Sequence, residues 1–232
     1  MTNILNIGTP PIPVHLRRVA RARRLSLRVS SVDGKVSLSM PVRASNRQAV
    51  AFATSHESWL RAQLGKRPQR SVPSFGDELT IDGARLTLTP GTSRRIRVAD
   101  GFLEIPGDIK GLPGRLRGYC RERARAVLAA HSDRFSAQIG HRYCGLTLRD
   151  TRSRWGSCSA SGRLMYSWRL IFAPPAILRY VAAHEVSHLA EHNHSPDFWR
   201  VVNSLDPDFK AHRKWLRAKG SELHRLDFGA PT

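Results

Sequence analysis

Ala183-His184-Glu185-Val186-Ser187-His188-Leu189-Ala190-Glu191-His192-Asn193-His194 is the stretch around which the rest of this chain is organised. It contains the pattern His-Glu-x-x-His and a further histidine six residues after the second one. Because residues four apart lie on one face of an α-helix, the imidazoles of His184 and His188 can approach one metal ion. Glu185, one position round the helix, can reach a water molecule on that ion. The stretch therefore predicts a metal site carried by a helix.

The third metal ligand depends on where this helix ends. A helix cannot bring a residue six positions further along back to the same point, so His194 is available only if the helix stops before it. Asn193, which tolerates a left-handed backbone, is expected to end the helix. Ser195-Pro196 has the pattern of a new helix start and fixes the chain directly after His194. His192 is the alternative: a rival third ligand, a group that supports the ligands, or an exposed side chain.

Zinc is the metal that this set of side chains favours. A catalytic zinc takes three protein ligands and keeps a fourth position for water, and neutral imidazole suits it as a donor. Water bound to such a zinc has a pKa of about 7 instead of about 15.7. We therefore expect His184, His188 and His194 to bind Zn²⁺. Glu185 would take a proton from the water, hold it and pass it to the leaving amine.

The composition is that of a folded protein with an unusual charge. Of its 232 residues, 41% are hydrophobic and 24% are charged, which is ordinary for a globular chain. The 38 Lys and Arg residues against 18 Asp and Glu residues give a formal net charge of +20. Such an excess attracts polyanions, so the basic surface offers a site for nucleic acid, but the same charge also serves solubility alone.

Cysteine spacing and the N-terminal residues indicate the compartment. Cys120, Cys144 and Cys158 are widely spaced, and they predict neither a disulfide framework nor a Cys-x-x-Cys metal site. Prolines near the N-terminus interrupt the apolar stretch that a signal peptide needs, and no segment is apolar enough to span a bilayer. We therefore expect a cytoplasmic protein that does not associate with a membrane.

Turn residues and hydrophobic periodicity predict an α+β fold whose N-terminal half is rich in strands. Asp33-Gly34 is a hairpin turn, and Ser45 caps a helix that follows the hairpin. The Gly- and Pro-rich residues 106–114 predict a linker. We therefore expect a β-rich N-terminal region with one helix in residues 1–110 and a separate core in residues 111–232. The strands expected in the first region cover residues 14–20, 25–30, 35–40, 78–81, 85–89, 94–98 and 102–105, and its helix extends to about residue 64.

Helices dominate the second half, which contains the metal pattern. Pro174-Pro175 ends a strand and begins the helix that carries His184, because proline is accepted in the first turn of a helix. The predicted architecture is a helix-rich catalytic core with a β-hairpin beside the active-site helix. The expected elements are a helix over residues 115–139, strands over residues 146–149 and 163–172 with a turn at residues 159–162, and two short helices after Ser195, the last ending at Gly220 before a frayed tail past Leu226.

Five blocks in this half form a distinctive set: Arg154-Trp155-Gly156-Ser157-Cys158, Trp168-Arg169-Leu170-Ile171, His184-Glu185-x-x-His188, His194-Ser195 and Phe198-Trp199. Together they resemble the YgjP-like zinc metallopeptidases, a family similar to the SprT-like and WLM peptidases within the zincin group. The resemblance covers nearly the whole chain and implies a zincin-like core in which the three histidines bind zinc and Glu185 is the general base. The best-studied relatives act on DNA-bound proteins. Tyr166-Ser167 departs from the family, which more often has an apolar residue and Asn at these positions.

Other side chains near the pattern are candidates for substrate contacts. Arg154 or Arg169 could meet a carboxylate or phosphate of the substrate. Gly156 permits the close approach of another backbone, and the edge of the hairpin could bind an extended peptide by strand addition. Simple packing of the hairpin on the helix is the alternative, and it suits Trp155. Tyr180 is a candidate donor to the oxyanion, although the sequence does not orient it.

The pattern favours a zinc metallopeptidase that cleaves polypeptides with a zinc-activated water. A second hypothesis keeps the metal site and assigns a nucleotide or other phosphoanhydride as the substrate, which the charge of +20 would attract. No Gly-rich phosphate loop accompanies that charge. A third hypothesis is a basic nucleic-acid-binding protein with a non-catalytic zinc. A merely structural zinc site has no need of Glu185, which argues against the third.

Overall fold

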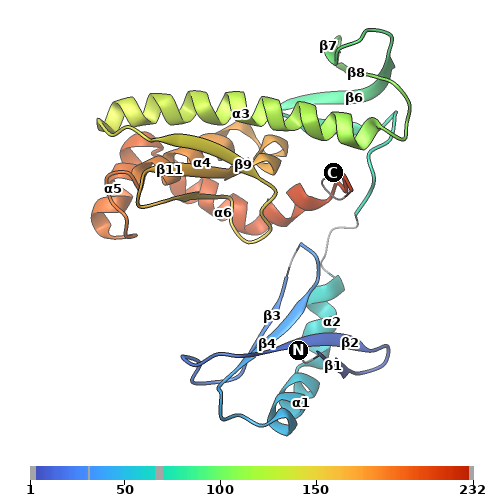
Figure 1. The fold of residues 1–232 in the computed structure, drawn as a ribbon, viewed down its shortest axis with the longest axis vertical. Coiled ribbons are helices and arrows are strands. Elements are labelled where there is room, and N and C mark those ends of the chain that lie inside the picture. Colours follow the sequence, from blue (N-terminus) through green and yellow to red (C-terminus); the bar gives the residue numbers. More distant parts are fainter. Residues whose placement is uncertain (1–3, 31, 66–69, 230–232) are drawn as a thin grey trace. The chain divides into compact units, whose positions relative to one another are not determined.

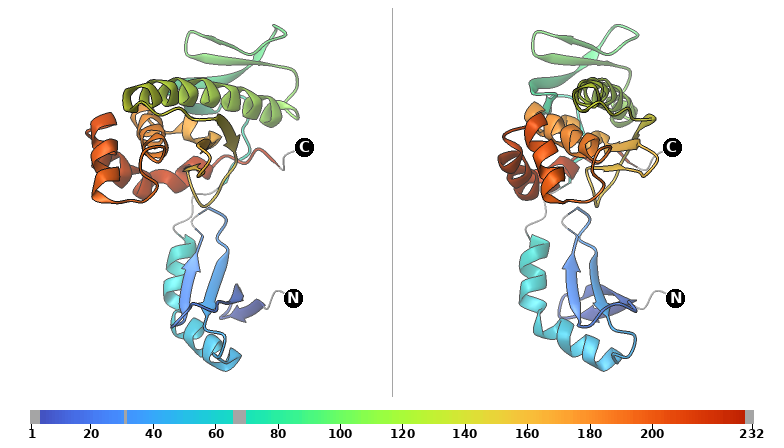
Figure 2. Two further views of the ribbon diagram at one scale, coloured as in Figure 1. Left: turned by 60° about the vertical axis from the view of Figure 1, so that its left-hand side comes forward. Right: turned by 90° about the vertical axis from the view of Figure 1, so that its left-hand side faces the viewer.

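The computed structural model describes residues 4–30, 32–65 and 70–229, which form two compact units (Figure 1, Figure 2). The first unit lies within residues 1–69 and the second within residues 70–232. Each unit has a hydrophobic core of its own. Among the helices of the described ranges, none is both long and apolar enough to cross a membrane.

The first unit is a four-stranded sheet with two helices packed on one face (Figure 2). Its elements are β1 (Ile4–Ile7), β2 (Ile12–Arg18), β3 (Ser26–Val29), β4 (Val36–Met40), α1 (Asn46–Ser55) and α2 (Glu57–Gly65). The strand order is β1-β2-β4-β3, in which β2 and β4 are parallel and the outer pairs are antiparallel. Val14, Val36 and Leu38 point toward the helices and are buried with Ala53 and Leu60.

The single helix predicted after Ser45 is two helices in the structure. Ser45 caps α1 as expected, since its hydroxyl accepts a hydrogen bond from the backbone N–H of Gln48. The backbone then leaves the helical region at His56, with φ −109° and ψ 15°, and α2 begins at the next residue. Strand β1, which no pattern predicted, pairs with β2.

The second unit begins with another four-stranded sheet of the same topology. Its strands are β5 (Glu78–Ile81), β6 (Ala84–Gly91), β7 (Arg97–Ala99) and β8 (Phe102–Pro106), in the order β5-β6-β8-β7. The central pair is again parallel and the outer pairs are antiparallel. Both predicted Asp-Gly turns are present: Asp82, Gly83, Asp100 and Gly101 all have positive φ, as a type I′ hairpin turn requires.

This second sheet belongs with the C-terminal core, whereas the sequence predicted a boundary after residue 110. The apolar side chains of its strands, such as Leu103, are buried in one cluster with Leu116 of the helix that follows. Residues 107–111 are therefore a short connection between β8 and that helix, which begins at Leu112, and the segment 106–114 is not a linker between domains. The division lies between residues 69 and 70 instead.

Helix α4 is the centre of the remaining structure. It contacts the long helix α3, which runs along one side of the unit in Figure 1, and it also contacts α5, α6 and β10. Strands β10, β11 and β9 form a three-stranded sheet, and the β10–β11 hairpin confirms the α+β core with a hairpin beside the central helix. The bounds are α3 (Leu112–Ile139), β9 (Gly145–Arg149), β10 (Gly156–Cys158), β11 (Arg163–Ser167), the 3₁₀ turn η1 (Trp168–Phe172), α4 (Pro175–Ser187), α5 (Pro196–Leu205), α6 (Phe209–Lys219) and η2 (Gly220–His224).

Two predicted segments of this unit take a different form. The strand expected to reach Phe172 ends at Ser167 and continues as η1, which buries Trp168 and Leu170. Of the tail expected to fray, the described part packs onto the core, because Phe228 is buried with its ring centroid 5.2 Å from that of Trp168, and residues 230–232 lie outside the described residues. Contacts with residues distant in the sequence determine the structure of both segments, and strand periodicity does not reveal such contacts.

Candidate metal centre

Three histidine side chains converge at the end of α4. The candidate ligand atoms of His184, His188 and His194 all lie within 4.8 Å of one another. Nε2 of His184 is 3.2 Å from Nε2 of His194, and the rings of His188 and His194 have centroids 4.9 Å apart. Within residues 4–30, 32–65 and 70–229, this is the only such group of three His, Cys, Asp or Glu side chains.

The spacing of these nitrogens fits one tetrahedral metal ion. Nitrogens that lie about 2.0–2.1 Å from a tetrahedral zinc are about 3.3 Å from each other. The 3.2 Å between Nε2 of His184 and Nε2 of His194 matches that separation. Two neutral imidazole nitrogens can approach so closely only if one of them donates a hydrogen or if a cation lies between them. The three residues therefore fit a metal bound by imidazole.

The chain reaches this arrangement by ending α4 earlier than the sequence predicted. The last residue of the helix is Ser187, and His188 is its C-cap. A tight turn follows, in which the N–H of Leu189 donates to a carbonyl of the last helical turn. Asn193 has no positive φ and lies after this turn, so the expectation that it ends the helix was wrong. The irregular segment after the turn carries His194 back to the other two rings.

Ser195-Pro196 begins α5 as predicted. The hydroxyl of Ser195 accepts a hydrogen bond from the N–H of Phe198 at 3.2 Å, and Pro196 is the first helical residue. Phe198 is buried, and its ring centroid lies 4.4 Å from that of His188 and 4.8 Å from that of His194. The ring centroid of Phe198 also lies 5.0 Å from that of His184, so the start of α5 packs directly against all three histidines.

Different contacts orient the histidine rings. Nδ1 of His188 is 3.0 Å from the backbone carbonyl oxygen of Glu191, so Nδ1 carries the proton and Nε2 is left for a metal. Nδ1 of His184 is buried without a hydrogen-bond partner among the described residues. Packing holds that ring instead, with centroids 5.8 Å from Trp199 and 6.0 Å from Tyr180.

Burial keeps these imidazoles neutral. It is the main cause that lowers the pKa of His184 from 6.5 to about 3, and the neighbouring histidines and Arg213 lower it further. Burial also lowers the pKa of His188, against the hydrogen bond to the Glu191 carbonyl. Neutral imidazole is the form that binds a metal ion, so burial keeps His184 and His188 in the form that a metal ion would require.

Glu185 lies between the histidines and strand β10. It is 6% exposed, and burial raises the pKa of its carboxyl group to about 8, while the positive charge of Arg154 opposes that shift. A methyl group added at Gly156 would lie only 2.5 Å from Cγ and Oε1 of Glu185. The glycine therefore leaves the space that this carboxyl group occupies, so the close neighbour of Gly156 is a side chain and not the backbone that the sequence led us to expect.

The remaining candidates fall into two places. Tyr180 is one turn before His184 on α4, and it is buried with its ring beside that histidine. Arg154 is exposed just before β10, close enough to act on the charge of Glu185. His192 is exposed and is not part of the group of three histidines.

Arg169 is engaged in contacts within the protein. Its Nε and Nη2 donate to the carboxylate of Asp150 at 2.6 and 3.0 Å, and its Nη1 donates to the carbonyl of Leu226 at 2.9 Å. The guanidinium also lies 4.9 Å from the ring centroid of Trp168. These contacts tie the C-terminal segment to the core, and they leave Arg169 unsuited to the substrate contact that the sequence suggested.

Asp206 and His212 form a polar pair that sequence reasoning missed. The carboxylate of Asp206 is fully buried and accepts hydrogen bonds from Nδ1 of His212 at 2.7 Å and from Arg179 at 2.8 Å. The ring of His212 lies 6.3 Å from that of Tyr180. A spacing of six residues across a turn matches neither helical nor strand periodicity, so no pattern linked the two residues. The only signal in the sequence was Asp206-Pro207, which predicts a turn.

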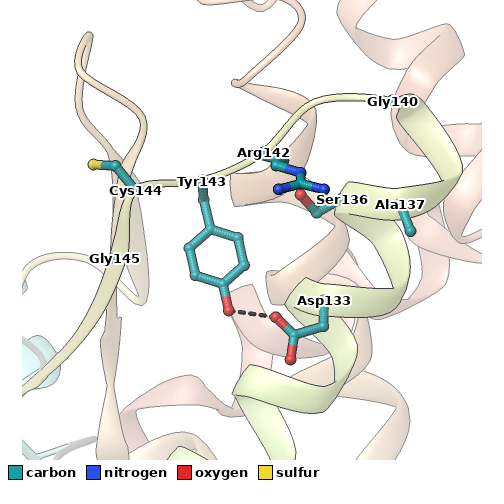
Figure 3. Close-up of a pocket in the computed structure, with 8 residues that line it drawn as sticks. All are labelled: Asp133, Ser136, Ala137, Gly140, Arg142, Tyr143, Cys144 and Gly145. Atoms are coloured by element: carbon teal, nitrogen blue, oxygen red, sulfur yellow. Dashed lines mark hydrogen bonds between the residues drawn. The ribbon is translucent and has the colours of Figure 1, made fainter.

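A hollow of about 650 Å³ lies elsewhere, where the end of α3 leads into β9 (Figure 3). The hydroxyl of Tyr143 donates to the carboxylate of Asp133 at its wall. The sulfur of Cys144 points away from the other labelled side chains in Figure 3. None of the three converging histidines lines this hollow, and its side chains form no catalytic constellation.

The comparison with protein families agrees with the chemistry of the histidine group. The family model of the YgjP-like metallopeptidase domain matches residues 23–219. The crystal structure of the metallopeptidase zymogen of Pyrococcus abyssi abylysin aligns with 40% of this chain and 93% of that chain, at 18% identity and a TM-score of 0.37. No curated protein matches the chain in sequence.

Proposed function

Since the chain belongs to the YgjP-like metallopeptidase family and is therefore a metal-dependent peptidase, we propose that it cleaves polypeptides with a zinc ion bound by His184, His188 and His194 and with Glu185 as the general base. The observation that carries this proposal is the convergence of three imidazoles beside one buried carboxyl group. A donor set of three neutral nitrogens is typical of catalytic zinc, which keeps its fourth position for water. When bound, zinc lowers the pKa of that water and polarises the scissile carbonyl.

Glu185 moves the proton in this proposal. Its carboxylate accepts a proton from the attacking water and later gives it to the nitrogen of the leaving amine. Because burial raises the pKa of the group to about 8, the carboxyl group can hold a proton near neutral pH as well as release one. The side chain has no hydrogen-bond partner among the residues that the structure describes, so both oxygens are available for this exchange.

Tyr180 is proposed as the hydrogen-bond donor to the oxyanion. Burial raises the pKa of its hydroxyl group to about 12, so the group stays protonated and can donate. That hydroxyl has no partner within the described ranges, and it is not among the polar atoms shut off from solvent. Tyr180→Phe is expected to lower kcat by about 10²-fold with little change in KM, and an unchanged kcat would remove Tyr180 from the mechanism.

An extended substrate is proposed to pair with the free edge of β10. This strand pairs only with β11 in its sheet, and its Gly156 lies against Glu185. A peptide added at that edge would be held by backbone hydrogen bonds, with its scissile bond close to the carboxyl group that accepts the proton.

The test of this function is the Glu185→Gln variant. The amide keeps the shape of the side chain but cannot act as a base, so we expect the metal content to be retained and the hydrolysis of a polypeptide such as casein to be lost. Glu191→Gln is the matched control, since Glu191 contacts His188 through its backbone carbonyl, which this substitution keeps. Full activity in Glu185→Gln would overturn the mechanism. Nucleoside triphosphates are assayed in parallel, and their hydrolysis in place of the polypeptide would assign a phosphoanhydride substrate.

We also propose that the first unit binds nucleic acid, which would bring the peptidase to nucleic-acid-associated proteins. Residues 1–69 contain 12 Lys and Arg residues but only 2 Asp and Glu residues, so a small unit carries a net charge of +10. The register places His15, Ser37 and Arg28 in one row across the sheet, and Arg17 beside Ser39 in the next. Along each strand these residues alternate with the buried residues that face the helices, so their side chains lie on the other face of the sheet.

Fluorescence anisotropy with a labelled oligonucleotide tests this binding. Arg17→Gln with Arg28→Gln should weaken binding and reduce the slope of log K against log salt by about 2, because two phosphate contacts are lost. Arg85→Gln is the control, since Arg85 is already paired with Glu78 in the second unit. Cleavage of a peptide free of nucleic acid should not change. Unchanged affinity in the double variant would contradict this proposal and leave the peptidase assignment intact.

A further inference from the structure

The three-stranded sheet beside the metal centre has an outer face that forms a hollow. Ser157 of β10, Met165 of β11 and Thr147 of β9 are paired across the sheet, so their side chains lie in one row on one face. The opposite face carries Leu148 and Leu164, which are buried in the core. The row of Ser157, Met165 and Thr147 forms the floor of a hollow of about 420 Å³.

Positive charge surrounds this hollow. Arg149, Arg154 and Arg163 line it, and no acidic side chain does. All three are exposed, and none has an ion-pair partner in the described part of the chain. Elsewhere in the same unit, arginines such as Arg123 and Arg179 are each paired with a carboxylate. Three like charges around one hollow repel each other until an anion enters it.

Strand β10 lies between the hollow and the carboxyl group of Glu185, the proposed base. Gly156 faces Glu185, and the next residue, Ser157, faces the hollow. Resting on the proposed function, a substrate paired with the edge of β10 would send alternate side chains to the two faces of the sheet. The side chain opposite Ser157 would therefore lie over the hollow, close to the scissile bond.

We propose that this hollow is a specificity subsite that binds an acidic side chain of the polypeptide substrate. The guanidinium groups of Arg154 and Arg163 would donate hydrogen bonds to the carboxylate, which is the group that a planar fork of N–H donors matches. The methionine and the threonine of the floor suit the methylene groups of a Glu side chain. The subsite makes the enzyme a peptidase with a preference for Asp or Glu near the cleaved bond.

A carboxylate side chain is favoured over a nucleic-acid backbone as the occupant. The hollow lies over a single short sheet, whereas a nucleic-acid strand presents a continuous row of phosphates. An occupant that reaches both Ser157 and Glu185 must also be continuous with the substrate in the site. A peptide satisfies both conditions with one chain.

Binding to the metal-loaded Glu185→Gln protein tests the subsite without relying on catalysis. Two labelled peptides that differ only by Glu or Gln are compared at each position near the middle of the peptide, at 0.15 M salt. We expect the Glu peptide to bind about tenfold to a hundredfold more tightly at one position, because a charge-assisted hydrogen bond is lost in the Gln peptide. This preference should disappear in the Arg154→Ala Arg163→Ala variant and persist in Arg85→Ala, which removes an exposed arginine from the β5–β6 pair instead.

Each outcome of this test decides the subsite separately from the peptidase function. Equal affinity for the Glu and Gln peptides, or a preference that survives loss of Arg154 and Arg163, would overturn the subsite. The subsite would also be overturned if loss of Arg154 and Arg163 weakened the binding of a competing oligonucleotide but not the binding of the Glu peptide. Cleavage by the wild-type protein is measured in parallel, and a preference in binding without any cleavage would count against the proposed function alone.

Discussion

Replacing Gly156 by Ala perturbs the proposed base without changing any reactive group. The added Cβ would lie 2.5 Å from Cγ and Oε1 of Glu185 and 2.6 Å from its Cδ. Carbon atoms in ordinary contact are about 3.5–4.0 Å apart, so the carboxyl group must move by about 1 Å. The histidines are not among the atoms nearest to the added methyl group.

A shift of about 1 Å in a catalytic group lowers the rate by about 10²-fold, and we expect that loss in kcat for Gly156→Ala. Metal content should be unchanged, and the free energy of unfolding should change by about 1 kcal/mol or less, because the end of a side chain gives way. Initial rates on a quenched fluorescent peptide are measured with metal content and melting temperature on the same samples. Gly118→Ala is the control, since nothing lies within 4 Å of its added Cβ.

A double variant shows whether the effect of Gly156→Ala passes through Glu185. In the Glu185→Gln background there is no base left to displace, so Gly156→Ala should not lower the residual rate further. The proposed role of Gly156 in positioning Glu185 is refuted if Gly156→Ala alone leaves kcat at the wild-type value. It is also refuted if the residual rate of Glu185→Gln falls by the same factor.

Three further changes test the structure that supports the site. Ser195→Ala removes the cap of α5, so the free energy of unfolding should fall by about 1 kcal/mol in denaturant titrations. Asp206→Asn removes the charge of a buried carboxylate that accepts hydrogen bonds from His212 and Arg179. The free energy of unfolding should therefore fall by about 2–3 kcal/mol in the same assay. His224 is buried, and this lowers its pKa from 6.5 to about 4, so the unfolded chain takes up a proton that the folded protein does not. Stability from this group is therefore present above pH 6.5 and falls by about 2 kcal/mol between pH 7 and pH 5, a loss that His224→Gln should remove.

One result would contradict each of these three expectations. Ser195→Ala with unchanged stability would mean that the cap does not hold α5 in place. Asp206→Asn at wild-type stability would show that the buried pair contributes nothing net. An equal loss of stability at pH 5 in wild type and His224→Gln would assign the acid sensitivity to other groups, such as the buried His184.

Local signals were sufficient for much of the fold and for the centre of the site. Asp82-Gly83 and Asp100-Gly101 predicted hairpin turns because a type I′ turn needs positive φ at both residues. The approach of His184 to His188 was predictable because a spacing of four residues places two side chains on one face of a helix, and the ring centroids lie 5.2 Å apart. Ser195-Pro196 predicted the start of α5 from cap chemistry alone.

Features that depend on distant contacts were not predictable in the same way. The end of α4 at Ser187 is set by the turn that follows and by packing of Phe198 on the histidines, which no residue near Asn193 indicated. The boundary expected after residue 110 followed the Gly- and Pro-rich composition there. It was misplaced because the strands before it share a core with α3. The pairing of Asp206 with His212 likewise depends on the geometry of the turn between α5 and α6, which follows neither helical nor strand periodicity.

Metal content of purified wild-type, His194→Ala and His192→Ala proteins tests the three-histidine centre most directly. His194 belongs to the converging group and His192 is exposed outside it, so two nearby histidines give opposite expectations. We predict one zinc ion per chain in the wild type and in His192→Ala, and loss of that zinc in His194→Ala. Retention of zinc in His194→Ala together with its loss in His192→Ala would contradict the proposed centre.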